Sequence, residues 1–238
     1  MVVTDAARRR ELFARVPMFA RLAPQELDAL FAVSHARTLA AGGELFHKGD
    51  RGMQVFVILR GRLKVVTTSA EGDDIVFGIM DPGEVFGELA LLADTGGVRT
   101  ATVVALDECE LLVLDRREFV PFLRAHPDAA IRLLETLAER LRRISEFVED
   151  TMFLNLPSRL AKKLVALADA YGKESPEGLW IDLEVSQEEL GDFVGTTRES
   201  INKQMKLWRD EGLARMEQGR ITILNPRRIQ ALAGMLER

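Results

Sequence analysis

Residues 86–92 and 98–102 combine side chains that can hold a phosphorylated ligand. Gly87 lets the backbone approach a ligand closely, and the backbone N–H groups of a short turn can bind an anion. Arg99 can add a bidentate contact to a phosphate, and the Glu88 carboxylate can accept a hydrogen bond from a ribose hydroxyl. The same residues would also suit a surface loop with an Arg–Glu ion pair. The residue types alone leave both interpretations open.

Residues 186–208 have the pattern of two short helices joined by a glycine turn. Ser186 and Glu189 form a capping box that starts the first helix, which we expect to stop at Gly195. Thr196 and Glu199 form a second capping box, which starts the second helix. This arrangement predicts a helix-turn-helix.

The second of these helices has an apolar face and a polar face. Ile201, Met205 and Trp208 recur at i, i+4 and i+7, so we expect them to pack inward. Arginine reads guanine edges, glutamate accepts from cytosine N4, and lysine holds phosphates, so the polar face suits the major groove of DNA. That face carries Arg198, Glu199, Asn202, Lys203 and Lys206.

The charge distribution adds to this interpretation. The chain has 32 Lys+Arg against 37 Asp+Glu, a net charge of −5. Residues 197–228 nevertheless hold 8 basic and 4 acidic residues. Taken singly, Glu199 is better explained by its capping box, and Arg198 can simply pair with a neighbouring carboxylate. Together with the helix-turn-helix, and with a hairpin or wing predicted around Gln218 and Gly219, the basic face favours DNA contact over a merely solvated surface.

The N-terminal half has a different texture. After a short helix at residues 24–34, β-prone runs alternate with Gly/Asp turns, which predicts an antiparallel sandwich or barrel. Asp115 and Glu118 form a capping-box pattern that ends this region and starts a helix. The β-prone runs are residues 54–59, 62–67, 75–80, 100–105 and 110–114.

A long helix is predicted over residues 127–153. Its apolar residues repeat at spacings of three and four, as in a coiled-coil seam, with charges around them. A core helix packing on its own β domain is the alternative, but the charged remainder favours a self-pairing helix and a homodimer. The helix breaks at residues 153–157, where Asn155 can cap the next helix, so we expect a domain boundary and hinge there. The seam residues are Leu134, Leu137, Leu141, Ile144 and Val148.

Composition narrows the class of protein. No apolar run reaches the roughly 18 residues that span a bilayer, and the charged start of the chain argues against a signal peptide. The single cysteine, Cys109, excludes intrachain disulfides and a cysteine-only metal cluster, so we expect a reducing cytoplasm. Serine hydrolase, Walker A and zinc-protease motifs are absent from the sequence, so we expect no enzyme activity.

The segments FGELALL, RTATV and TTRESINK, which start at Phe86, Arg99 and Thr196, resemble the CRP/FNR family, the cyclic-AMP receptor proteins and fumarate–nitrate reduction regulators. The resemblance covers roughly residues 10–230. It implies an α+β fold with three parts: a cyclic-nucleotide-binding β-roll (double-stranded β-helix or jelly roll) at residues 1–126, a dimerisation helix and hinge at 127–154, and a winged helix-turn-helix at 155–238. It also implies a homodimer that binds palindromic double-stranded DNA and works with RNA polymerase, away from membranes.

The resemblance also implies a ligand. Arg99 and Thr100 match residues that hold the cyclic phosphate, Glu88 matches the acceptor of the ribose 2′-hydroxyl, and Gly87, Leu89 and Ala90 line the turn. Ile144 and Ser145 align with a Thr-Ser pair that meets the adenine base. Ile144 cannot bond the exocyclic amine and Thr100 resembles a guanine-binding threonine, and both departures favour cyclic GMP. Cyclic AMP still comes first because it is the frequent effector of the family, with cyclic GMP close behind. A cyclic di-GMP regulator and a vestigial pocket stay as alternatives, whereas an iron–sulfur cluster, a haem and a bound metal are not expected.

For DNA, the resemblance assigns base reading to Arg198, Glu199 and Lys203, and phosphate contacts to Ser186 and Thr197. Asn202 and Lys203 stand where the best-known member has glycine and arginine, so the DNA half-site need not be identical to the TGTGA half-site of that member.

Overall fold

The computed structural model describes residues 5–68, 74–92 and 97–235. Its contacts divide the chain into two compact units, and along the long helix α5 (Pro127–Phe153) the division falls between Leu141 and Arg142. The three-part division at residues 126 and 154 stays a prediction. None of the described helices is both long enough and apolar enough to cross a bilayer.

The N-terminal unit contains two antiparallel four-stranded sheets, in the orders β1-β8-β3-β6 and β2-β7-β4-β5. Buried residues from both sheets, among them Phe56 on β3 and Val103 on β7, form one apolar core. The strands are β1 (His35–Leu39), β2 (Glu44–Phe46), β3 (Gln54–Arg60), β4 (Leu63–Thr68), β5 (Asp74–Met80), β6 (Val85–Phe86), β7 (Thr102–Ala105) and β8 (Cys109–Asp115).

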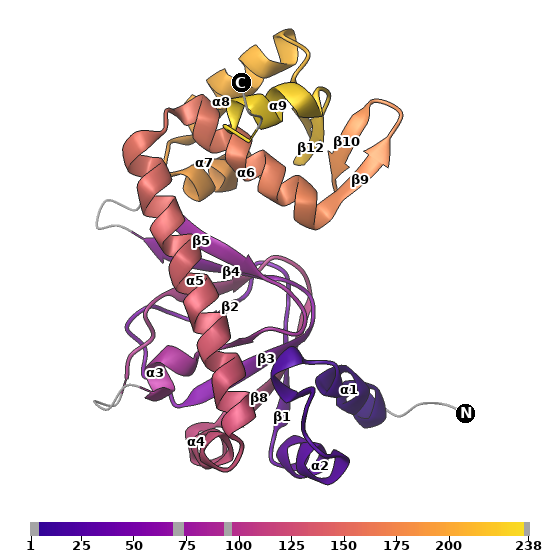
Figure 1. Cartoon of the computed structure of the whole chain (residues 1–238), viewed down its shortest axis with the longest axis vertical. Coiled ribbons are helices and arrows are strands. Elements are labelled where there is room, and N and C mark those ends of the chain that lie inside the picture. The colour runs from indigo at the N-terminus through magenta and orange to yellow at the C-terminus, as the bar shows by residue number, and fades with distance from the viewer. Residues whose placement is uncertain (1–4, 69–73, 93–96, 236–238) are drawn as a thin grey trace. The chain divides into compact units, whose positions relative to one another are not determined.

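Helices cover the other face of the first sheet (Figure 1). Val55 and Val57 on β3 and Leu112 and Leu114 on β8 belong to a second core that also holds Phe119 on α4. Strands β3 and β8 are therefore apolar on both faces, which explains why their sequences are nearly unbroken apolar runs. The helices of this unit are α1 (Asp5–Ala14), η1 (Pro17–Phe19), α2 (Pro24–Ala32), α3 (Glu88–Leu92), α4 (Arg116–Ala125) and the first part of α5.

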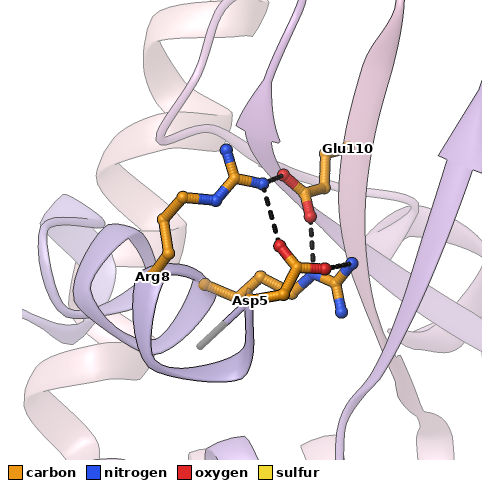
Figure 2. Close-up of polar contacts among 4 residues, drawn as sticks. Asp5, Arg8 and Glu110 are labelled. Carbon is orange, nitrogen blue, oxygen red and sulfur yellow. Dashed lines mark hydrogen bonds and ion pairs between the residues drawn. The ribbon is translucent and has the colours of Figure 1, made fainter. Parts of the chain in front are cut away.

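An ion-pair network ties α1 to β8 (Figure 2). Glu110 on β8 is 7% exposed, and its carboxylate accepts from Arg8 Nη2 at 2.6 Å and from Arg9 Nε at 2.5 Å. Asp5 pairs with the same two arginines at 3.3 and 2.7 Å, which closes a ring of four charges. Arg10 bonds Asp28 on α2. The basic run at the start of the chain therefore serves internal ion pairs.

The C-terminal unit contains the rest of α5 and a small sheet in the order β11-β12-β10-β9. Asn155 caps α6 as predicted, since its side chain accepts from the Ser158 N–H. The β11–β12 hairpin turns at Gln218 and Gly219, both with positive φ, which confirms the predicted wing. The elements are α6 (Leu156–Tyr171), β9 (Gly172–Ser175), β10 (Gly178–Ile181), α7 (Gln187–Val194), α8 (Arg198–Asp210), β11 (Ala214–Glu217), β12 (Arg220–Ile223) and α9 (Pro226–Leu232).

The helix-turn-helix forms with one change of cap. The Ser186–Glu189 capping box is present, and α7 ends at Gly195 in the left-handed conformation, as predicted. The predicted box at Thr196 is wrong: Thr197 is the N-cap of α8, and its hydroxyl accepts from the Ser200 N–H. Asp115 does precede α4, but it makes no side-chain cap, because its carboxylate accepts from Gln54 Nε2.

Candidate nucleotide-binding and DNA-binding sites

Gly87 links β6 to the short helix α3 with φ of 88°, a conformation that favours glycine. A Cβ atom there would lie 2.7 Å from Arg99 Nη1 and 3.1 Å from the Gln54 carbonyl oxygen. Glycine at this position therefore provides the room in which the Arg99 side chain lies.

The Arg99 guanidinium is buried in this turn, with 5% of the residue exposed. Its Nη1 donates to the Gly87 carbonyl at 3.0 Å and its Nη2 to the Gln54 carbonyl at 2.9 Å. The guanidinium also lies over the rings of Phe46 and Phe56, 4.2 and 5.2 Å from their centroids. Burial lowers the pKa of Arg99, while the Glu88 and Asp50 carboxylates oppose this shift. Arg99 is thus a desolvated cation without a carboxylate bonded to it among the described residues.

Glu88, the first residue of α3, is 1% exposed. Its Oε1 accepts from Arg140 Nη1 at 2.9 Å, and Arg140 also donates to the Val85 carbonyl at 2.8 Å and pairs with Glu84 at 3.3 Å. Arg140 lies on α5, so this ion pair joins the turn directly to the long helix.

Two buried polar atoms of this turn have no hydrogen-bond partner in the described part of the chain. They are Glu88 Oε2 and Arg99 Nε. A buried donor or acceptor without a partner costs about 1–3 kcal/mol, and more when it is charged. A ligand that presents a hydroxyl donor and an anionic acceptor would satisfy both atoms.

The other predicted ligand residues lie in several environments. Ala90 is buried and Leu89 is 51% exposed on α3, while Thr100 is exposed after Arg99. Ile144 and Ser145 lie on the part of α5 that belongs to the C-terminal unit, so their contact with a base stays a prediction.

On α8, Ile201, Met205 and Trp208 are at most 4% exposed, as the periodicity predicts. The opposite face is exposed. There Glu199 and Lys203 form an ion pair at 2.9 Å, and the hydrogen bond from Lys203 lowers the pKa of Glu199.

The predicted phosphate contacts, Ser186 and Thr197, lie at the exposed N-termini of α7 and α8. The side chains of Arg198 and Lys206 make no hydrogen bond or ion pair with the rest of the described chain, so both cations are available to DNA.

Comparison with known proteins matches each of these two sites to a known domain family. The family model of the cyclic nucleotide-binding domain matches residues 36–126, and that of the Crp-like helix-turn-helix domain matches residues 158–232. The chain belongs to the CRP/FNR family of transcription regulators. It is therefore a DNA-binding regulator with a cyclic nucleotide-binding domain, not an enzyme.

Several CRP/FNR relatives align over nearly the whole chain. The CRP-like cAMP-activated global transcriptional regulator of Mycobacterium tuberculosis is 28% identical over 92% of this chain and 97% of its own. The cyclic AMP receptor protein of Thermus thermophilus is 28% identical over 91% of this chain and 96% of its own. In fold, the chain resembles the c-di-GMP-responsive regulator CLP of Xanthomonas campestris, with a TM-score of 0.75 at 21% identity, covering 84% of this chain and 99% of that one.

The structure adds residues that sequence analysis missed. Arg140 donates a hydrogen bond to the Glu88 carboxylate. Phe46 and Phe56 pack against the Arg99 guanidinium. Gly52 also lies next to this group, since a Cβ there would come within 3.1 Å of it. The position of Arg140, one turn before Ile144 on the predicted helix, was a usable signal. Phe46 and Phe56 gave no such signal, because apolar residues in predicted strands are expected to belong to the hydrophobic core.

Lys163 on α6 gives a pH-dependent prediction for the DNA-binding unit. Its ammonium lies 4.0 Å from the Phe193 ring centroid on α7, and burial lowers its pKa to about 8, with a smaller effect from Arg143. Between pH 8 and 10.5 the unfolded state binds more protons, so stability rises with pH. We expect unfolding free energy to rise by about 1–2 kcal/mol from pH ~7.5 to ~9.5 in urea titrations followed by tryptophan fluorescence. Both tryptophans, Trp180 and Trp208, lie in this unit.

The Lys163→Met variant should lose most of this pH dependence and be more stable near neutral pH. Lys162→Met is the matched control, because Lys162 is paired with Asp150 at 2.8 Å. Equal pH profiles for the wild type and Lys163→Met would contradict the assignment.

Proposed function

We propose that this protein is a homodimeric transcription regulator whose affinity for palindromic DNA is controlled by cyclic AMP bound in the N-terminal domain. The observation that carries this proposal is the pair of unpartnered buried atoms, Glu88 Oε2 and Arg99 Nε. A cyclic nucleotide presents a ribose 2′-hydroxyl, which can donate to the carboxylate, and a singly charged phosphate, which can accept from the guanidinium. Arg99 and Thr100 would hold the phosphate and Glu88 the ribose.

The ion pair between Glu88 and Arg140 supports control through α5. A ribose hydroxyl bound to the Glu88 carboxylate would change the surroundings of Arg140, which lies on α5. A ligand shifts a conformational equilibrium only by its difference in affinity for the two states. The Glu88–Arg140 contact is one place where such a difference can arise, and residues 153–157 are the proposed hinge.

The exposed apolar stripe of α5 supports self-association through this helix. Leu134, Leu141, Ile144 and Val148 are 42–65% exposed, whereas charged side chains alternate with them. Heptad spacing of exposed apolar residues is the pattern of a two-stranded coiled coil. A two-fold dimer would place two copies of α8 about 34 Å apart, in successive major grooves. The DNA-bound dimer would then lie on the same DNA as RNA polymerase, the further partner that we propose.

The effector is tested by calorimetric titration of the purified full chain with cyclic AMP and, in parallel, cyclic GMP. We propose cyclic AMP first because the curated relatives named above are cyclic AMP proteins. Micromolar binding of cyclic AMP, together with tighter binding to palindromic DNA, is the expected result. Preference for cyclic GMP or cyclic di-GMP would reassign the ligand. Unchanged DNA affinity at saturating nucleotide would overturn effector control.

A further inference from the structure

The exposed face of α8 carries one polar side chain that is neither a cation nor an anion. Asn202 lies one turn after Arg198 and one turn before Lys206 on α8. In sequence it falls between Glu199 and Lys203, which form an ion pair with each other. Its carboxamide is exposed and is the only uncharged group among the five residues predicted to form the polar face of α8.

Asn202 has a partner on the other helix of the helix-turn-helix. The side chain of Gln187, the first residue of α7, donates from Nε2 to Asn202 Oδ1 at 3.5 Å. The Ser186–Glu189 capping box fixes the start of α7, because Ser186 N donates to Glu189 Oε2 at 2.9 Å. This long hydrogen bond directs Asn202 Oδ1 toward the Gln187 side chain on α7.

An asparagine amide matches one base in the major groove. Adenine presents an acceptor at N7 beside a donor at N6, and a carboxamide can bond both at once. Guanine presents acceptors at both N7 and O6, so the same amide would set Oδ1 against O6. Since a carbonyl oxygen has two lone pairs, Asn202 Oδ1 can accept from Gln187 and from adenine together.

We propose that Asn202 reads an adenine in each DNA half-site and that Gln187 is the positioning residue that orients its amide. The inference rests on the proposed function in one respect, that α8 enters the major groove. The neighbouring ion pair of Glu199 and Lys203 cannot supply this preference, because a carboxylate selects cytosine and an ammonium selects guanine.

Selection of binding sites from a pool of palindromes with randomised half-sites, using the full chain with cyclic AMP, tests the proposal. The wild type should enrich adenine at one position of each half-site, and Asn202→Ala should reduce the adenine-to-guanine preference there by about 10-fold or more. Gln187→Ala should reduce it by a smaller factor, roughly 3-fold. The other positions should be unchanged.

Asn202→Asp gives a second measurement, the identity of the preferred base, which would not change if Asn202 only supported the fold. It removes the donor and leaves two acceptors, so the preferred base at that position should change from adenine to cytosine. Both variants alter exposed side chains, and equal thermal unfolding to the wild type checks that the fold is intact. Lys206→Ala is the control for a phosphate contact, which should weaken binding without changing the selected sequence.

The outcomes separate this inference from the proposed function. A selected sequence that is identical for the wild type, Asn202→Ala and Asn202→Asp overturns the adenine assignment and leaves the regulator intact. A wild-type chain that selects no sequence, with or without cyclic AMP, overturns the proposed function itself.

Discussion

Replacing Arg99 by alanine is expected to weaken cyclic AMP binding by about 100-fold or more, equivalent to ~2.7 kcal/mol. The guanidinium is buried, its Nε is unpartnered, and it lies beside a carboxylate that also lacks a full set of partners. Loss of a desolvated, charge-assisted hydrogen bond costs more than loss of an exposed one. Isothermal titration of the full chain measures the effect, and DNA binding should no longer respond to nucleotide.

Arg99 also holds the backbone, since it donates to the carbonyls of Gly87 and Gln54. The alanine variant could therefore lose affinity through a disturbed turn. Arg99→Lys separates the two causes, because lysine keeps the charge and loses the planar fork. Binding that falls less in Arg99→Lys than in Arg99→Ala, with unfolding curves like the wild type in both, supports the phosphate role, because only the charge is kept in the lysine variant. Cyclic AMP binding that is unchanged in Arg99→Ala would overturn the assignment of this pocket.

A third variant tests the connection to α5. Arg140→Ala removes the partner of Glu88 Oε1 but leaves Arg99 untouched. If Arg140 acts only through Glu88, this variant should bind cyclic AMP and yet show a smaller nucleotide-induced change in DNA affinity than the wild type. The Arg99 and Arg140 variants therefore distinguish binding of the nucleotide from transmission of its effect.

Sequence periodicity predicted the parts of this fold that depend on local pattern. The long helix was placed at residues 127–153 and forms over Pro127–Phe153. The inward face of α8 and the turn at Gly195 were also predicted, because spacing of apolar residues and a left-handed glycine are local signals. Five strand runs were located within about two residues of their observed bounds.

The elements that sequence analysis missed lack such signals. β1 is a largely exposed strand with the polar sequence HARTL, and it is held by its ladder to β8. α1 reads as a charged run, and its place depends on Glu110, about one hundred residues away. The Thr196 cap was wrong because Thr197, one residue later, also satisfies the cap pattern. Tertiary contacts decide such cases, and a single sequence does not contain them.

The candidate nucleotide site shows the same limit. Gly87, Glu88 and Arg99 were found from residue type and from the family resemblance. The contribution of Arg140 was missed, because it depends on which face of α5 meets the β6–α3 turn. The exposed polar residues of α8 were named from the sequence, and their contact with DNA stays a prediction. The pairing of Glu199 with Lys203 and of Gln187 with Asn202 comes from the structure.

Arg198→Ala is expected to lower affinity for the selected palindrome by about 10- to 100-fold, while affinity for random DNA changes by less than about 3-fold. Arg198 is the first residue of α8, exposed and without an ion-pair partner in the described chain. The N-terminal residues of a recognition helix contact base edges. Binding to DNA therefore breaks no ion pair of Arg198 with the described residues, and no such loss offsets the energy of its contact with DNA.

Lys206→Ala is the matched control, because the Lys206 side chain is also exposed and has no partner in the described part of the chain, but it lies two turns further along the same helix. We expect it to weaken both DNAs by similar factors and to reduce the slope of log K against log salt by about one. Fluorescence anisotropy with saturating cyclic AMP, repeated at several salt concentrations, measures both quantities. Equal losses on cognate and random DNA in Arg198→Ala would make Arg198 a phosphate contact. Base reading would then rest on Asn202 and on the ion pair of Glu199 with Lys203.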